Sequence, residues 1–137
     1  MTLAVVDSSV ALSWCFADEA SAESDRQLDY VRDHGALVPG LWFLEVANVL
    51  LQAEKRGRIS GADVLLRLEL ISSLPIMVDQ NGVGLAWGPV LEMARAEGLT
   101  VYDAAYLELA ARRGLALFSR DRALVAAATR RGVVVSL

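Results

Sequence analysis

The sequence contains very few of the residues that build catalytic sites from nitrogen or sulfur. It has one cysteine, Cys15, one histidine, His34, and one lysine, Lys55. A single cysteine excludes an internal disulfide bond and a metal site built from cysteines, so we interpret Cys15 as a packed thiol. His34 lies at the end of a predicted helix, and we interpret it as a helix-end residue, not as a base.

Long uncharged apolar runs are also missing. No uncharged stretch approaches the roughly 18 to 20 residues of a membrane-spanning helix, and Asp7 interrupts the N-terminus before a signal-peptide core forms. We therefore expect a cytoplasmic protein with a single domain over residues 1–137. The hydrophobic fraction is nevertheless high, at 55% with a mean hydropathy of +0.40. This composition indicates helices on both sides of a sheet, apolar surface reserved for partners, or both.

Basic residues are fewer than acidic ones. The chain has 13 bases against 17 acids, so its net charge of −4 excludes binding of nucleic acid by bulk attraction, and any such role is local. Twelve of the bases are arginines, which favour bidentate contacts with phosphate or carboxylate groups. Six bases precede glycines where helices are predicted to end, and we interpret them as helix-termination signals. They occur as Lys55-Arg56-Gly57, Arg112-Arg113-Gly114 and Arg130-Arg131-Gly132.

Short apolar runs alternate with helical patterns along the chain, which predicts an α/β fold with a mostly parallel sheet. The predicted strands are residues 3–6, 36–38, 75–79, 115–118 and 133–135. The predicted helices are residues 8–16, 20–34, 41–56, about 60–73, 83–97, 100–113 and 121–131.

The first predicted strand ends directly at a carboxylate. Asp7 follows the apolar run at residues 3–6, and two hydroxyls, Ser8 and Ser9, come next. In open parallel sheets, ligands gather outside the carboxyl ends of the strands, which is where Asp7 would lie. All three residues also suit an N-cap of the following helix, so both interpretations stay open.

Glu45 is the acid that is hardest to explain structurally. The helix predicted around it is apolar except for Glu45, Asn48 and Gln52, which form a thin polar stripe. A carboxylate on an otherwise buried helix is costly unless it is paired or bound to a metal. The structural alternative to a metal ligand is a buried ion pair with an arginine.

Two further acids stand at the starts of helices. Asp103 opens an apolar helix, where Thr100 would complete a capping box, and Asp121 follows the strand predicted at residues 115–118. Helix capping explains each of them separately. Asp7 and Asp121 nevertheless share one edge of one sheet.

Four segments, taken in order and at their spacing, resemble the PIN-domain ribonucleases, most closely the VapC toxins of bacterial toxin–antitoxin pairs. The segments are Val5-Val6-Asp7-Ser8-Ser9-Val10, Glu45-Val46-Ala47-Asn48-Val49-Leu50, Thr100-Val101-Tyr102-Asp103-Ala104-Ala105-Tyr106 and Ser119-Arg120-Asp121. The resemblance spans essentially the whole chain and implies a three-layer α/β/α domain with a short, mostly parallel sheet. It also implies a divalent-metal site formed by Asp7, Glu45, Asp103 and Asp121, assisted by the hydroxyl of Ser119. Relatives often have Pro-Glu-Glu where this chain has Asp18-Glu19, so no role is carried over to Glu19.

The residue types fit this chemistry independently. A set of oxygen ligands suits Mg²⁺ or Mn²⁺, which keep waters and bind through a few carboxylates and substrate phosphate. Such a metal activates water, so no histidine or lysine nucleophile is required. Together with this chemistry, the resemblance implies a Mg²⁺- or Mn²⁺-dependent endoribonuclease that cleaves RNA.

The expected partners follow from the resemblance and from the apolar excess. We predict a homodimer and a small VapB-like antitoxin that covers the active-site side. The side chains expected to be exposed for these contacts are Leu12, Trp14 and Phe16.

Other functions fit the sequence less well. A haloacid-dehalogenase-type phosphotransferase needs a second aspartate where Ser9 stands, and a response-regulator receiver needs a lysine late in the chain, where none follows Lys55. A catalytically inactive PIN-like module that binds RNA or protein is the main alternative, although all four acids are present. An unrelated α/β interaction protein, with capping acids and a buried ion pair, is the remaining one.

Overall fold

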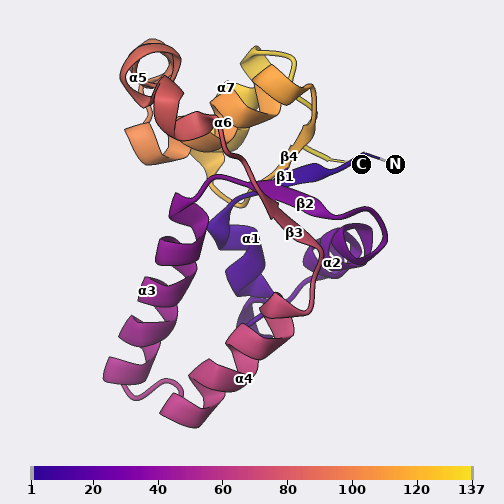
Figure 1. Cartoon of the computed structure of the whole chain (residues 1–137). Helices are drawn as coiled ribbons and strands as arrows, with labels where there is room; N and C mark the ends of the chain where they lie inside the picture. The colour runs from indigo at the N-terminus through magenta and orange to yellow at the C-terminus, as the bar shows by residue number, and fades with distance from the viewer. Residues whose placement is uncertain (1, 137) are drawn as a thin grey trace.

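Four short parallel strands form the centre of the fold (Figure 1). The computed structural model describes residues 2–136, and its strands are β1 (Ala4–Val6), β2 (Ala36–Val38), β3 (Ile76–Val78) and β4 (Ala116–Phe118). Their order is β3-β2-β1-β4, and every neighbouring pair is parallel. The chain adds β2 and β3 on one side of β1 and then crosses to the other side for β4. The topological switch point therefore lies between β1 and β4.

Seven α-helices surround the strands in the described part of the chain. They are α1 (Ser8–Ser13), α2 (Ala22–His34), α3 (Leu41–Lys55), α4 (Gly61–Ser72), α5 (Leu91–Glu97), α6 (Val101–Arg113) and α7 (Arg122–Arg130). Five of them begin at a side chain that accepts a hydrogen bond from the first helical turn, which satisfies an otherwise unpaired N–H group. These N-caps are Asp7, Ser21, Ser60, Thr100 and Asp121.

Three helices end at the glycines that the sequence indicated. Gly57, Gly114 and Gly132 have φ angles of 73°, 64° and 73°, in the left-handed region that favours glycine. The helix-termination prediction for the basic residues before these glycines is confirmed.

Helices cover both faces of the sheet, as a three-layer fold requires. On one face, Val6 and Phe118 pack with Val31 of α2. On the other face, Val5 belongs to a core that includes Leu107 of α6. Alternate strand residues thus point to opposite cores, which confirms the predicted α/β/α architecture and makes the sheet wholly parallel.

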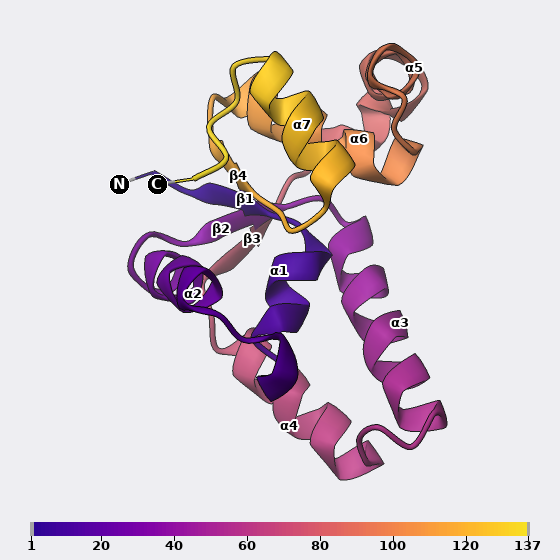
Figure 2. The same cartoon turned by 180° about the vertical axis from the view of Figure 1, so that it is seen from behind.

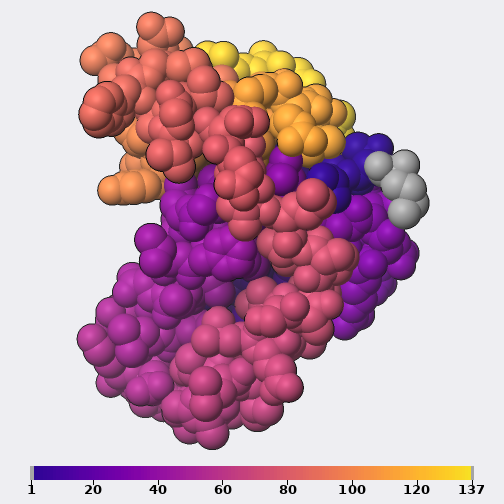
Figure 3. All heavy atoms as spheres, in the orientation of Figure 1, coloured from indigo at the N-terminus to yellow at the C-terminus, as the bar shows by residue number. Residues whose placement is uncertain are grey.

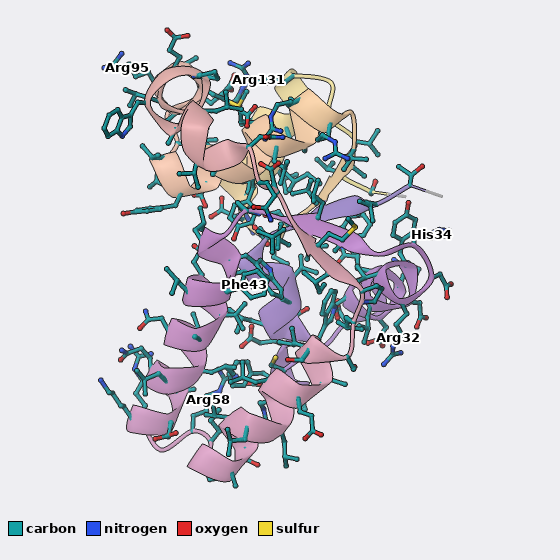
Figure 4. All side chains as sticks on the ribbon, in the orientation of Figure 1. Arg32, His34, Phe43, Arg58, Arg95 and Arg131 are labelled. Carbon is teal, nitrogen blue, oxygen red and sulfur yellow. The ribbon has the colours of Figure 1, made fainter. Side chains whose placement is uncertain are left out.

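α3 and α4 form a hairpin that extends away from the sheet, with α1 beside it (Figures 1 and 2). A hollow between the two helices is visible in Figure 3, and its lining includes Trp42, Val46, Leu68 and Ile71. Phe43, on the α3 side of this hollow (Figure 4), is half exposed, and Leu44 is exposed. The expectation that α3 is buried on all sides is therefore wrong, because only its inner face belongs to the core.

Two predicted elements differ in the structure. Residues 133–135 form no strand, because a single backbone hydrogen bond joins them to β4, from the Leu117 N–H to the Val134 carbonyl at 2.8 Å. The helix predicted at residues 83–97 is split into a 3₁₀ turn (Gly82–Leu85), a π turn (Ala86–Val90) and α5. Pro89 lies inside the π turn and lacks the N–H that a continuous helix requires.

The first predicted helix is shorter than expected. α1 ends at Ser13, and a 3₁₀ turn (Ala17–Glu19) follows it. Leu12 and Phe16 are buried, and Trp14 donates its indole N–H to the Ser24 carbonyl at 3.0 Å. The prediction that Leu12, Trp14 and Phe16 are exposed for partners is therefore wrong. Leu12 and Phe16 belong to the hydrophobic core, and the partly buried Trp14 packs against it.

Apolar surface lies elsewhere on the molecule. The exposed large side chains include Leu44, Val83, Trp87 and Tyr102, and a second group on α4 and β3 comprises Leu65, Leu66, Leu70 and Met77.

None of the described helices has the length and apolar composition required to cross a membrane. Cys15 is buried, and burial raises the pKa of its thiol to about 11, consistent with a packed role.

Candidate functional site

Asp7 lies at the carboxyl end of β1 and is almost fully buried. One of its carboxylate oxygens accepts hydrogen bonds from the Ser9 hydroxyl and from the Val10 N–H at 3.2 Å, and the other accepts from the Ser119 hydroxyl. Burial raises the pKa of Asp7, although these hydrogen bonds lower it. Asp7 therefore caps α1 and also lies at the carboxyl edge of the sheet. The capping interpretation and the sheet-edge interpretation are thus compatible.

The loop after β4 is joined to Asp7 by two hydroxyls. The Ser119 hydroxyl donates to Asp7 and accepts from the Asp121 N–H at 3.0 Å. The Ser9 hydroxyl also donates to Asp7 and accepts from the Arg120 N–H at 3.0 Å. These paired contacts hold the ends of β1 and β4 together at the switch point, where the exposed Asp121 caps α7.

Glu45 reaches the same edge from the beginning of α3. Its Oε1 accepts a hydrogen bond from the hydroxyl of Tyr106 on α6. Burial raises the pKa of Glu45, the Tyr106 hydroxyl lowers it, and the negative charges of Asp103 and Asp7 raise it further. Within residues 2–136 no arginine or lysine forms an ion pair with Glu45, so the buried ion-pair interpretation does not hold.

Asp103 lies in the first turn of α6, half-buried. Its N–H donates to the Thr100 side chain at 3.1 Å, but only this half of the predicted capping box forms. Burial raises the pKa of Asp103, and the negative charges of Asp121 and Asp7 raise it further. The structure thus places Asp7 near Glu45 and Asp103, and Asp121 near Asp103.

The four acids gather several carboxylates at one edge of the sheet. Across residues 2–136, none of the four enters an ion pair with an arginine or lysine. In the same part of the chain, no three acidic, histidine or cysteine side chains are grouped tightly enough to hold one ion by themselves. Mg²⁺ usually keeps several waters and takes only one or two carboxylates in addition to substrate phosphates. The donor set therefore fits Mg²⁺ or Mn²⁺ without a complete protein cage.

Sequence reasoning missed Tyr106 and the bridging role of Ser9. Tyr106 stands three residues after Asp103, on the same face of α6, and its polar hydroxyl on an apolar helix is the signal that could have identified it. Ser9 was considered only as a cap. Asn48, one turn after Glu45 on the predicted polar stripe, is exposed.

The fold and the acids together define an α/β protein with a candidate divalent-metal site at its switch point. Residues 4–129 match the PIN domain, and the chain therefore belongs to the PIN-domain family. PIN domains are typically metal-dependent nucleases. A comparison with curated proteins finds no significant match.

A solved structure supports the assignment of the fold. The chain is similar to PAE2754 from Pyrobaculum aerophilum, known from a crystal structure, with 28% sequence identity and a TM-score of 0.69. The similarity covers 93% of this chain and 87% of PAE2754.

Proposed function

We propose that this protein is a divalent-metal-dependent endoribonuclease, and that Asp7, Glu45, Asp103 and Asp121 hold its Mg²⁺ or Mn²⁺. The observation that carries the proposal is a set of four carboxylates, gathered at the switch point of a PIN domain, with no basic residue paired to them across residues 2–136. A bound ion would activate water for attack on the RNA phosphodiester and stabilise the charge that develops there.

The surrounding side chains have supporting roles in this proposal. The Ser119 hydroxyl orients the Asp7 carboxylate, and the Tyr106 hydroxyl orients the Glu45 carboxylate. Hydrogen bonds of this kind fix ligand orientation and tune ligand basicity. Hydrolysis by an activated water would leave a 5′-phosphate on the product, whereas a 2′,3′-cyclic phosphate would indicate a different reaction.

We further propose that the protein is the toxin of a toxin–antitoxin pair and acts in the cytoplasm, where its RNA substrate is found. Leu44, Tyr102 and Trp87 are 75%, 66% and 95% exposed, and Leu44 and Tyr102 each adjoin one of the acids in the chain. Apolar side chains of this kind suit a protein partner such as a small VapB-like antitoxin on the acid side. The second apolar group, on α4 and β3, provides surface for a homodimer.

One observation favours a second candidate, an inactive PIN-like module that binds RNA or protein. Within residues 2–136 the acids are not grouped tightly enough for three of them to share an ion. In that case the carboxylates would repel one another without supporting cleavage.

A cleavage assay separates the two functions. Purified protein is incubated with RNA in Mg²⁺, in Mn²⁺ and in excess EDTA, and the product ends are identified. We expect cleavage with either metal, none in EDTA, and 5′-phosphate ends. Cleavage that continues undiminished in EDTA would exclude the metal mechanism, and RNA binding without cleavage in either metal would favour the inactive module.

A further inference from the structure

An RNA substrate is a polyanion, and the four acids of the proposed active site repel it. Binding of RNA at this site therefore requires a positively charged side chain nearby. Three arginines of the later helices are already paired with acids. Arg112 lies 2.8 Å from both Asp79 and Glu108, and Arg130 and Arg131 both bind Glu97. Arg120 differs from these, because it stands between two residues of the candidate site.

The backbone of Arg120 is held firmly relative to Asp7. Its own N–H donates to the Ser9 hydroxyl at 3.0 Å, and the next N–H, of Asp121, donates to the Ser119 hydroxyl at 3.0 Å. Both hydroxyls donate in turn to the Asp7 carboxylate. The base of the Arg120 side chain is therefore fixed to the same carboxylate that lies at the centre of the site.

One end of the Arg120 guanidinium is anchored to the 3₁₀ turn after α1. Its Nη1 donates to the main-chain carbonyl of Glu19 at 3.0 Å, and the Glu19 carboxylate lies farther away, at 3.9 Å. Arg58 lies closer to that carboxylate, at 3.2 Å, and also binds Asp18 at 2.6 Å. Arg58 packs on the ring of Phe16 at 3.9 Å, beside the α3–α4 connection (Figure 4). Arg58 thus makes the closer contacts with both carboxylates of the turn, and the hydrogen bond that holds the Arg120 guanidinium there goes to a main-chain carbonyl.

The other edge of the guanidinium is open. Among residues 2–136, no protein atom accepts a hydrogen bond from Nε or Nη2 of Arg120, and the side chain is 43% exposed. These two groups form the planar fork that binds two phosphate oxygens at once.

We propose that Arg120 binds a backbone phosphate of the RNA next to the scissile position, with the Glu19 carbonyl as its anchor and Arg58 as the support of that anchor. This inference rests on the proposed ribonuclease function and adds a substrate-binding residue to it. Contact with a phosphate positions the strand without reading its sequence. Arg120 therefore contributes to affinity for RNA in general, and sequence preference arises elsewhere.

The test compares Arg120→Gln with Arg113→Gln. Arg113 is exposed at the end of α6, at the opposite edge of the sheet, and its substitution removes the same charge. Cleavage of a labelled single-stranded RNA of mixed sequence is measured in Mg²⁺ at several salt concentrations. We expect Arg120→Gln to lower kcat/KM by about 10-fold or more, mainly through KM, as loss of a charge-assisted contact implies. The Mg²⁺ concentration for half-maximal activity should stay unchanged, and Arg113→Gln should behave as wild type.

Binding of the same RNA, followed by fluorescence anisotropy, provides a second readout. The slope of log K against log salt should become shallower by about 0.7 for Arg120→Gln, as expected for one lost phosphate contact on a single strand. Arg120→Lys retains the charge but lacks the planar fork, so its affinity for RNA should lie between those of the wild type and Arg120→Gln. Equal kcat/KM and equal salt slopes for Arg120→Gln and Arg113→Gln would overturn the inference.

The two proposals fail in different ways. If the wild-type protein binds RNA but does not cleave it, the ribonuclease proposal fails, and the salt slopes still decide the role of Arg120. If the wild-type protein cleaves RNA and Arg120→Gln cleaves it equally well, only the Arg120 inference fails. If the wild-type protein neither binds nor cleaves RNA, both fail.

Discussion

Two groups of buried acids lie at the carboxyl edge of the same sheet, and they differ in their partners. Asp79, after β3, is 7% exposed and lies 2.8 Å from Arg112, which also binds Glu108 on α6. Asp7, after β1, is 5% exposed and receives only hydroxyl and N–H donors. The hydrogen bond and charge of Arg112 lower the pKa of Asp79, whereas burial raises the pKa of Asp7.

This contrast separates an acid that is paired with a cation inside the protein from one that we propose as a metal ligand. Asp79 is neutralised within the protein, so its pair with Arg112 fastens the end of β3 to α6. The acids around Asp7 have no cationic partner within residues 2–136, and neighbouring negative charges raise the pKa values of Glu45 and Asp103. Clusters of this kind are typical of functional sites. PIN-domain nucleases generally use Mg²⁺ or Mn²⁺, and such an ion would compensate the charge of these acids. The predictions below test this difference, beginning with the largest effect.

The substitution Asp103→Asn should abolish RNA cleavage while leaving the metal-free protein at least as stable as wild type. It removes one of the charges that repel Asp7 and Glu45, and it removes a proposed metal ligand. Added Mg²⁺ should therefore stabilise the variant less than the wild type. Thermal melts in EDTA and in Mg²⁺, beside one cleavage assay, measure all three effects. A variant that melts lower in EDTA and still cuts RNA would show that Asp103 is only a capping residue.

The substitution Arg112→Met should instead destabilise the fold by about 3 to 5 kcal/mol, because it leaves two buried carboxylates without a cation. Chemical denaturation at neutral pH gives the free energy of unfolding. Arg113→Met is the matched control, since the neighbouring side chain is exposed and in no ion pair within residues 2–136. Equal stability of the two variants would contradict a structural role for the Arg112 cluster.

The substitution Tyr106→Phe should destabilise the protein by about 1 to 3 kcal/mol and raise the Mg²⁺ concentration that cleavage requires. It removes the hydroxyl that donates to Glu45 and leaves that partly buried carboxylate without its strongest donor. Tyr102→Phe, on the exposed side of the same helix, should change neither quantity. Mg²⁺ titrations of activity and denaturation curves for both variants test this, and an unchanged Mg²⁺ requirement for Tyr106→Phe would exclude an orienting role.

The smallest expected effect is a difference in pH dependence. The folded-state pKa of Asp103 is raised above its ordinary value of 3.8, so the folded protein holds its proton more strongly than the unfolded chain. In EDTA, the wild type should therefore lose unfolding free energy relative to Asp103→Asn as the pH rises through the interval above 3.8. Asp79 has a lowered pKa and acts in the opposite direction, since its contribution is present above 3.8 and is lost as the pH falls. Melts between pH 3 and 7 measure both trends, and parallel curves for the two proteins would contradict the raised pKa of Asp103.

Much of the fold could be predicted from the sequence because its signals are local. The apolar runs became β1 to β4, and glycines after basic pairs ended α3, α6 and α7 within one or two residues of the predicted positions. The signals for the four acids are also local: Asp7 and Asp121 follow strands, Asp103 lies in a first helical turn, and Glu45 interrupts an apolar helix. The segment at residues 133–135 has the composition of a strand, but a strand also needs a paired neighbour. β4 makes only one backbone hydrogen bond with this segment.

Only the tertiary structure decided which acids are paired with a cation and which are not. Asp79 and Asp7 look alike in the sequence, since each ends an apolar strand, but Arg112 reaches Asp79 from 33 residues away. The sequence left Glu45 open as a metal ligand or as the partner of an arginine, and in the structure its carboxylate accepts a hydrogen bond from Tyr106, 61 residues along the chain. Burial of Leu12 and Phe16 and exposure of Leu44 and Trp87 were likewise settled by packing between distant elements. Local patterns thus determined the elements and the candidate acids, whereas electrostatic partners and exposed surface depend on distances that arise only when those elements pack together.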